Sequence, residues 1–305
     1  MFCLLLSKQT TSLQAHLEVL KNIPDLTWTP EIPKFLQNKS QAQVDMYFTP
    51  RQQSRQVPKF TPINTNTNTS APETHQDSVG FDWTVQRPEC LNYIEPMEHC
   101  VQTELFASIN MFSDIRCIKN LDKQRVQYSY QYQLSCYNDG NGCNQKLNDD
   151  VDFAGYLGKP FGTVPASCVS YTSGKTGKVP KCPTKCDDGS NLPNRVWMDD
   201  APSSSTWSQE MWFLCEEMVQ SMVREGPVQM GFNAYSDLVF YSGGVYTHSY
   251  GNSLGEFRGE VVGWGTDNGV KFWKMKMFYG EDWGERGFLR IAQAELITRL
   301  WYFTM

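Results

Sequence analysis

Residues 226–246 read GPVQMGFNAYSDLVFYSGGVY, and this run marks a change in the character of the chain. After Pro227, short segments rich in Val, Phe, Tyr and Trp alternate with glycine turns such as Gly243-Gly244 and Asp267-Asn268-Gly269. Segments of this composition between glycine turns are typical of antiparallel strands. The pattern therefore predicts strands over 228–234, 238–247, 258–264, 270–278 and 287–291.

The sequence before this run predicts helices. Apolar residues recur on one broad face over 103–118, and the same spacing returns over 208–225, where Gly226-Pro227 ends it. Cys215 falls on the apolar stripe of the second helix, where a small buried thiol is expected. Helices early and antiparallel strands late predict an α+β fold of two lobes.

Residues 1 to about 80 differ in composition from the rest. Residues 14–20 favour a short helix, whereas 51–80 are rich in Gln, Asn, Thr and Pro and predict a linker. Asn38 and Asn68 begin N-x-S sequons and are candidate glycosylation sites. We therefore expect an arm over 1–50, a polar linker over 51–80 and a globular domain over 81–305.

Charge and hydropathy restrict the partners. The 305 residues contain 27 Lys and Arg against 33 Asp and Glu, a net charge of −6, with no basic block. This argues against nucleic acid or an anionic membrane as the principal partner. No apolar run approaches the roughly 18–20 residues of a membrane span. The opening MFCLLLS has a shorter apolar run than the ~7–15 residues of a secretory signal.

Ten cysteines are many for a chain long enough to fold without cross-links, and nine lie between Cys90 and Cys215. Cys136 with Cys143 and Cys182 with Cys186 have spacings that also occur in zinc sites. The other interpretation is a set of disulfides in an oxidising compartment.

Seven motifs now carry a resemblance. They are Gly226-Pro227-Val228, Tyr235-Ser236-Asp237-Leu238, Tyr241-Ser242-Gly243-Gly244-Val245-Tyr246, Val262-Gly263-Trp264-Gly265, Asn268-Gly269, Phe272-Trp273 and Asp282-Trp283-Gly284-Glu285-Arg286-Gly287-Phe288. Together they resemble the papain-like cysteine peptidase family, most closely its cathepsin B branch, over about 81–291. The resemblance implies the two-lobe papain-like fold, with a helical left lobe and an antiparallel, β-barrel-like right lobe.

The resemblance also implies disulfides, which favour that interpretation over zinc. The implied pairs are Cys90 with Cys117, Cys100 with Cys143, Cys136 with Cys182, and Cys168 with Cys186, leaving Cys3 and Cys215 free. Four bridges imply a secretory, extracellular or lysosome-like location, and the mitochondrial intermembrane space is the alternative. No metal or cofactor is implied.

The family's nucleophile lies three residues after a bridged cysteine and three before a helical Phe, and Cys100 and Phe106 place that position at Thr103. A threonine hydroxyl needs a base to react, so we expect Thr103 to serve instead as the N-cap of its helix.

The other three catalytic positions also differ from the family. The histidine base would lie six residues before Gly263, at Phe257. The Asn that orients the histidine falls at Met277, and the oxyanion Gln falls at Met97. The Trp that covers the Asn becomes Tyr279. Because loss of triad members typically costs about 10⁴–10⁶ in rate, we predict a catalytically inactive protein.

The substrate cleft is altered as well. Gln145 and Lys146 stand where the family has two glycines whose backbone binds peptide, so their side chains are expected to crowd that edge. The segment 169–181 is short and has no histidine, so the dipeptide-removing activity of cathepsin B is not implied. Met97, Phe257 and Met277 predict an apolar groove that could accept a hydrophobic side chain.

Residues 17–28 weakly resemble the cathepsin B prosegment, which in the family runs through the cleft. We expect the arm to stay attached, across the cleft or along a protein partner. The predicted role is a structural or binding subunit of a larger assembly, or an extracellular interaction module. Two alternatives are peptide hydrolysis by Thr103 with His99 or Glu104 as the base, and a decoy or regulator of active cathepsins.

Overall fold

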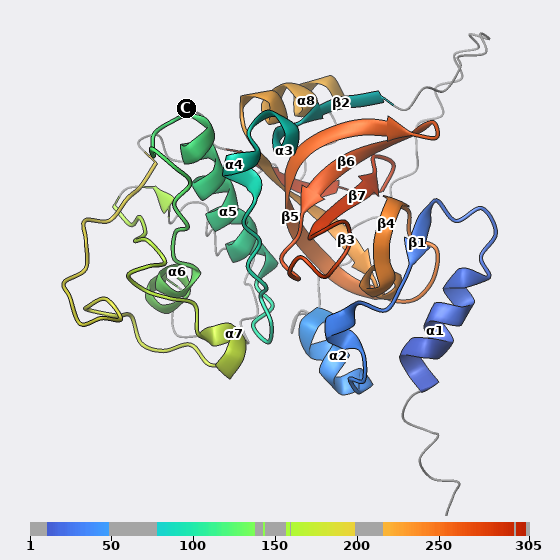
Figure 1. Cartoon of the computed structure of the whole chain (residues 1–305), viewed down its shortest axis with the longest axis horizontal. Coiled ribbons are helices and arrows are strands. Elements are labelled where there is room, and N and C mark those ends of the chain that lie inside the picture. Colours follow the sequence, from blue (N-terminus) through green and yellow to red (C-terminus); the bar gives the residue numbers. More distant parts are fainter. Residues whose placement is uncertain are drawn as a thin grey trace, which may run out of the picture.

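A computed structural model of the chain describes residues 11–48, 78–137, 143, 157–158, 160–198, 216–295 and 297–302. Helices gather on one side of the molecule and a twisted sheet on the other, and the N-terminal arm lies below the sheet (Figure 1). The α+β class predicted from the sequence is confirmed, and the two sides correspond to the two lobes.

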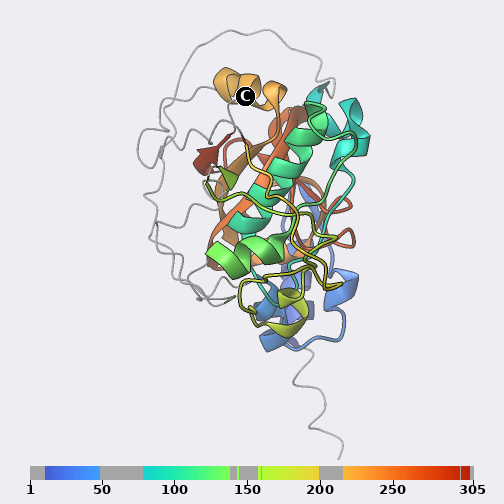
Figure 2. The same cartoon turned by 90° about the vertical axis from the view of Figure 1, so that its left-hand side faces the viewer.

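The helical lobe is organised around one long helix. Its helices are α3 (Trp83–Gln86), α4 (Pro88–Leu91), α5 (Thr103–Ile118), α6 (Tyr130–Tyr137) and α7 (Ser173–Thr176). Every residue of α5 except Arg116 is buried, because α5 packs against the sheet on one side and α6 on the other. Helix α8 (Glu216–Glu225) also packs against β5 and lies beside the C-terminal end of α5, where Lys119 Nζ is 3.5 Å from Glu225 Oε2 (Figure 2). The bounds of α5 are those that the sequence predicts.

The sheet contains seven strands in the order β1-β4-β7-β6-β5-β3-β8, and β2 pairs with β5 as an eighth. Their bounds are β1 (Trp28–Pro30), β2 (Ser78–Asp82), β3 (Val228–Tyr235), β4 (Tyr241–Tyr246), β5 (Ser253–Asp267), β6 (Val270–Lys276), β7 (Phe288–Ala292) and β8 (Ile297–Trp301). The described pairings are antiparallel except for β4 with β7, which run parallel over two residue pairs. The right lobe is therefore not purely antiparallel.

One predicted strand is partly wrong. The first residues of the 238–247 segment belong to a 3-10 helix, η5 (Ser236–Phe240), and the strand begins only at Tyr241. The cause is Asp237, which is buried and accepts hydrogen bonds from the Tyr246 hydroxyl at 2.6 Å and from the backbone N–H of Ser249 at 2.8 Å. These bonds hold a tight turn that a strand would pull apart.

The arm comprises α1 (Thr11–Lys21), β1, a short 3-10 helix η1 (Lys34–Leu36) and α2 (Gln41–Phe48). Strand β1 extends the sheet by pairing with β4, with Trp28 opposite Gly244. Gly244 has φ +90, and a Cβ at this position would lie 2.6 Å from the Thr27 carbonyl oxygen. A glycine is therefore needed where the arm meets the sheet. Part of the predicted linker, 51–77, lies outside the described residues, and its end forms the start of β2.

Four disulfides join Cys90 to Cys117, Cys100 to Cys143, Cys136 to Cys182, and Cys168 to Cys186. These are the pairs that the family resemblance implies, and they leave the zinc interpretation without its ligands. Cys3 and Cys215 lie outside the described residues, as does the first half of the helix predicted over 208–225.

Candidate functional site

The candidate site lies where the first turn of α5 meets strand β5. Thr103 is the first residue of α5, and Gln102 before it is the N-cap, with no capping hydrogen bond from its side chain. The Thr103 hydroxyl Oγ1 instead accepts a hydrogen bond from the backbone N–H of Arg258 at 3.1 Å. The prediction that Thr103 caps its helix is therefore wrong, because the hydroxyl is engaged across the junction by β5.

A buried ion pair lies beside this hydrogen bond. The Arg258 guanidinium Nη1 is 2.6 Å from Oε1 of Glu104, and the two side chains are only 9% and 5% exposed. Glu256 also approaches Arg258, with Oε1 at 3.3 Å from Nε. The helix and the strand are thus joined by one neutral contact, Thr103 with Arg258, and one ionic contact, Glu104 with Arg258. Glu256 belongs to β5 itself and binds Arg258 within the strand.

The remaining predicted positions form an apolar cluster next to this junction. Phe257 and Met277 are fully buried, and the Phe257 ring centroid lies 6.4 Å from that of Tyr279. Burial raises the pKa of the Tyr279 hydroxyl well above its usual range. Met97 joins the cluster through its backbone, whose N–H donates to the Phe278 carbonyl at 2.9 Å. The four positions assigned from the sequence are therefore brought together by the fold.

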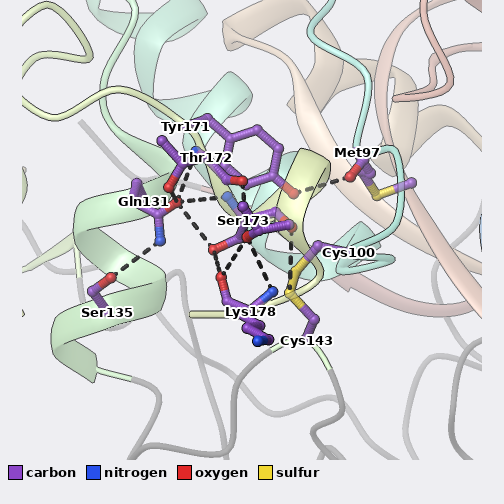
Figure 3. Close-up of a disulfide and its surroundings, with 10 residues drawn as sticks. Met97, Cys100, Gln131, Ser135, Cys143, Tyr171, Thr172, Ser173 and Lys178 are labelled. Carbon is purple, nitrogen blue, oxygen red and sulfur yellow. Dashed lines mark hydrogen bonds between the residues drawn. A yellow bond between two sulfur atoms is a disulfide. The ribbon is translucent and has the colours of Figure 1, made fainter. Parts of the chain in front are cut away.

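Figure 3 shows how Met97 is held from the helical side. The Tyr171 hydroxyl donates to the Met97 carbonyl at 3.0 Å. Two residues further on, Ser173 donates to Gln131 Oε1 from both its backbone N–H and its hydroxyl, each at 3.0 Å. The disulfide between Cys100 and Cys143 closes the same region (Figure 3). Met97 thus lies on a segment that is fixed on both sides.

The arm covers the apolar cluster. Phe48, the last residue of α2, is 1% exposed, and its ring stacks on Tyr279 with a centroid distance of 4.5 Å. The adjacent Tyr47 ring lies 5.1 Å from that of His99. A side chain of the same protein therefore packs beside the residues from which the apolar groove is predicted.

A second ionic cluster links α5 to the sheet deeper in the molecule. Asp114 binds Lys276 Nζ and Arg125 Nε, both at 2.6 Å. Glu260 lies 3.7 Å from the same Lys276 ammonium and is fully buried. Burial raises the pKa of Glu260 well above its usual range, and the nearby Asp114 carboxylate adds to that shift. The two ionic clusters thus lie within an α5–sheet contact whose other residues are largely apolar.

The chemistry available at Thr103 is limited in the described residues. Glu104 is engaged by Arg258, and the ring of His99 packs against Tyr47 of the arm. Neither contact brings a base to the Thr103 hydroxyl, whose partner across the junction is an N–H donor. Among the described residues, these contacts hold α5 and β5 together at Thr103.

The other predicted residues are more scattered. Gln145, Lys146 and Asn68 lie outside the described residues, whereas Asn38 is exposed before α2 with φ +65. No group of three metal-binding side chains occurs in the described part of the chain. Among those same residues, no helix is both long and apolar enough to span a membrane.

The partners of the site were not predicted from the sequence. Arg258 directly follows Phe257, and Glu104 directly follows Thr103, so each replaced position is followed by a charged residue. Two opposite charges beside two positions expected to face each other were a signal for an ion pair. The sequence carried no such signal for Phe48, because a single Phe at the end of a short helix does not indicate which residue it packs against.

Comparison with known proteins agrees with this architecture. The sequence profile described as "Papain family cysteine protease" matches residues 78–298. The chain therefore belongs to the papain family of cysteine proteases.

Its similar relatives include two from Giardia intestinalis. "Cathepsin B-like CP3" is 32% identical over 267 residues, which cover 87% of this chain and 84% of the relative. "Cathepsin B-like CP2" is 36% identical over 223 residues, 72% of this chain and 71% of the relative. Among solved structures, "proCathepsin B S9 from Trypanosoma congolense" matches with a TM-score of 0.67 at 22% identity, covering 95% of this chain and 97% of that one. The last match concerns a proform and includes the arm.

Proposed function

We propose that this chain is a catalytically inactive, cathepsin B-like protein of the papain family that acts as a structural or binding subunit. The observation that carries the proposal is the hydrogen bond from the Arg258 N–H to Thr103 Oγ1, at the position where the family places its nucleophile. Phe257 and Met277 cannot accept or orient a proton at the positions of the base and its partner. Removal of a complete triad leaves at most a small residual rate.

The arm supports the same proposal. Phe48 and Trp28 are buried, and the arm contributes a strand to the sheet. We propose that the arm remains attached and covers the site, so that the protein presents the arm and its surroundings to partners. The four disulfides are consistent with an oxidising secretory or lysosome-like compartment for this role.

Neither alternative function has a specific observation in its favour. A Thr103 nucleophile needs a free base, but Glu104 is paired with Arg258 and the His99 ring packs against the arm. A decoy that captures peptides needs an accessible groove, but Phe48 stacks over Tyr279 at its edge.

The test is a peptidase assay on generic fluorogenic peptides at acidic and neutral pH, with an active papain-family enzyme as the positive control. We expect the wild-type chain, Thr103→Ala and Thr176→Ala to be indistinguishable from buffer, because Phe257 cannot act as a base and Met277 and Met97 cannot orient one or donate to an oxyanion. Hydrolysis by the wild-type chain that is lost in Thr103→Ala but kept in Thr176→Ala, an exposed control, would contradict the proposal. Arm retention is tested by mass spectrometry of the native protein, and chains that begin near Ser78 would refute it.

A further inference from the structure

The segment 175–185, KTGKVPKCPTK, is an exposed positive strip on an acidic protein. Its lysines, Lys175, Lys178, Lys181 and Lys185, are all exposed. No acidic residue and no arginine occurs anywhere in 160–186. Because the whole chain carries −6 and this segment +4, the remaining residues carry −10. We call residues 175–185 the lysine segment.

Most of these lysines lack an acidic partner, whereas most of the described lysines elsewhere have one. Ion pairs engage Lys21, Lys119, Lys271, Lys274 and Lys276. In the described part of the chain, no carboxylate lies within ion-pair distance of Lys178, Lys181 or Lys185. Lys175 is different, since it lies near Glu95 and lowers the pKa of that carboxyl against the larger, raising effect of burial. Lys178, Lys181 and Lys185 are therefore exposed and without an acidic partner among the described residues.

The lysine segment is held in place rather than free to collapse onto acidic neighbours. Disulfides fix Cys182 to Cys136 and the adjoining Cys186 to Cys168. At the other end, Ser173 Oγ lies 2.9 Å from the Lys178 carbonyl oxygen, so its hydroxyl is shared between this carbonyl and Gln131 (Figure 3). A fixed backbone lowers the entropy that is lost when a ligand binds.

The side-chain chemistry selects the class of ligand. Lysine offers a compact point charge, whereas the planar fork of arginine suits paired carboxylate oxygens. The segment has no aromatic residue on which a nucleic-acid base could stack. Recognition by charge density alone favours a flexible polymer with closely spaced, permanently ionised anions. From Lys178 to Lys185 the backbone spans at most about 25 Å, so several anions of one chain can be contacted together.

We propose that the lysine segment is a binding surface for a sulfated polysaccharide. The proposal rests on the proposed binding role of the protein and names a class of partner for it. Binding would replace counterions at the polymer by ammonium groups, so the affinity is expected to depend steeply on salt.

The experiment measures binding of the full, oxidised chain to immobilised heparin from about 50 to 500 mM NaCl. The variant Lys178→Gln/Lys181→Gln/Lys185→Gln is compared with the control Lys21→Gln/Lys34→Gln/Lys123→Gln, which removes three exposed lysines elsewhere. We expect the segment variant to raise Kd about tenfold or more at low salt. We also expect it to reduce the slope of log K against log salt by about 2, that is ~0.7 for each lost contact. The control is expected to retain wild-type affinity within about twofold.

Several results would overturn the proposal. The first is that the wild-type chain does not bind heparin at about 50 mM salt. The second is that the two triple variants lose the same amount of heparin affinity. The third is that the wild-type chain binds desulfated heparin as tightly as heparin. If the chain bound polyglutamate or single-stranded DNA more tightly than heparin, the sulfated polysaccharide would be the wrong class of partner. Thermal melting of both variants checks their folding. Peptidase activity measured on the same preparation tests the proposed loss of catalysis separately, since heparin binding does not depend on that result.

Discussion

Replacing Arg258 by Met is expected to destabilise the fold by about 3–5 kcal/mol, the usual cost of removing one partner from a buried ion pair. Arg258 and Glu104 are 9% and 5% exposed with 2.6 Å between their charged atoms, so water cannot take the place of the missing charge. Glu256, at 3.3 Å from Arg258, would lose its partner as well. Met keeps much of the length and apolar stem of Arg, so the loss reports mainly on charge.

The reciprocal change is expected to cost less. Glu104→Gln leaves Arg258 with Glu256, so we expect a loss of about 2 kcal/mol. The double variant Glu104→Gln/Arg258→Met removes both charges and is expected to be more stable than Arg258→Met alone. The coupling energy from the cycle should be about 1–3 kcal/mol. The matched control is the exposed pair of Lys271 and Glu216, 2.8 Å apart, whose cycle should give below about 1 kcal/mol.

The measurement is urea unfolding of the oxidised chain at pH 7, followed by tryptophan fluorescence. If unfolding proves irreversible, unfolding rates in urea give the same comparison in kinetic form. A coupling energy no larger than that of the Lys271 and Glu216 control would refute the reasoning. It would mean that the helix and strand do not depend on this ion pair, and that the charges beside Thr103 are incidental.

Two further predictions concern the arm and pH. Phe48→Ala should lower the free energy of unfolding by about 3–5 kcal/mol and increase hydrogen exchange over 11–48, because the Phe48 ring stacks on buried Tyr279. The control Phe35→Ala should cost less, because Phe35 is only half-buried. Unchanged exchange in Phe48→Ala would show that this contact does not hold the arm. Because the folded pKa of Glu260 is raised, its contribution to stability is complete below the unfolded pKa near 4.5 and is lost as pH rises through the folded pKa. Glu260→Gln cannot ionise, so its melting temperature should fall less than that of the wild-type chain from about pH 4.5 upward, and parallel curves for the two proteins would be inconsistent with this assignment.

The sequence predicts those parts of the fold whose pattern is local. The helix over 103–118 has the predicted bounds, because its apolar residues recur at helical spacing over that whole range. The strands after Pro227 are mostly predicted, because aromatic and β-branched residues stand between glycine turns. Strand β1 of the arm is not predicted, since three residues carry no periodic signal and the strand exists only by pairing with β4.

The site is predictable in position but not in its contacts. The spacing from Cys100 and from Gly263 places Thr103 and Phe257, and the fold does bring their neighbourhoods together. Their interaction depends on the register of β5 against α5, which joins residues more than 150 positions apart in the sequence. Local pattern cannot specify that register, so the N-cap expected for Thr103 was the reasonable local interpretation and was wrong. The long-range hydrogen bond to Arg258 replaced it.

The arm and the altered site depend on each other physically. Helices α1 and α2 have 11 and 8 residues, lengths that are marginal for an isolated helix, so the arm is ordered by what it packs against. Its buried residues belong to the same apolar core as Phe257, Met277 and Tyr279. Release of an arm from an active relative would uncover polar catalytic groups, whereas here it would uncover Tyr279 and the apolar cluster behind it to water. The substitutions proposed to end catalysis would therefore also raise the cost of releasing the arm, because its removal would expose apolar side chains to water.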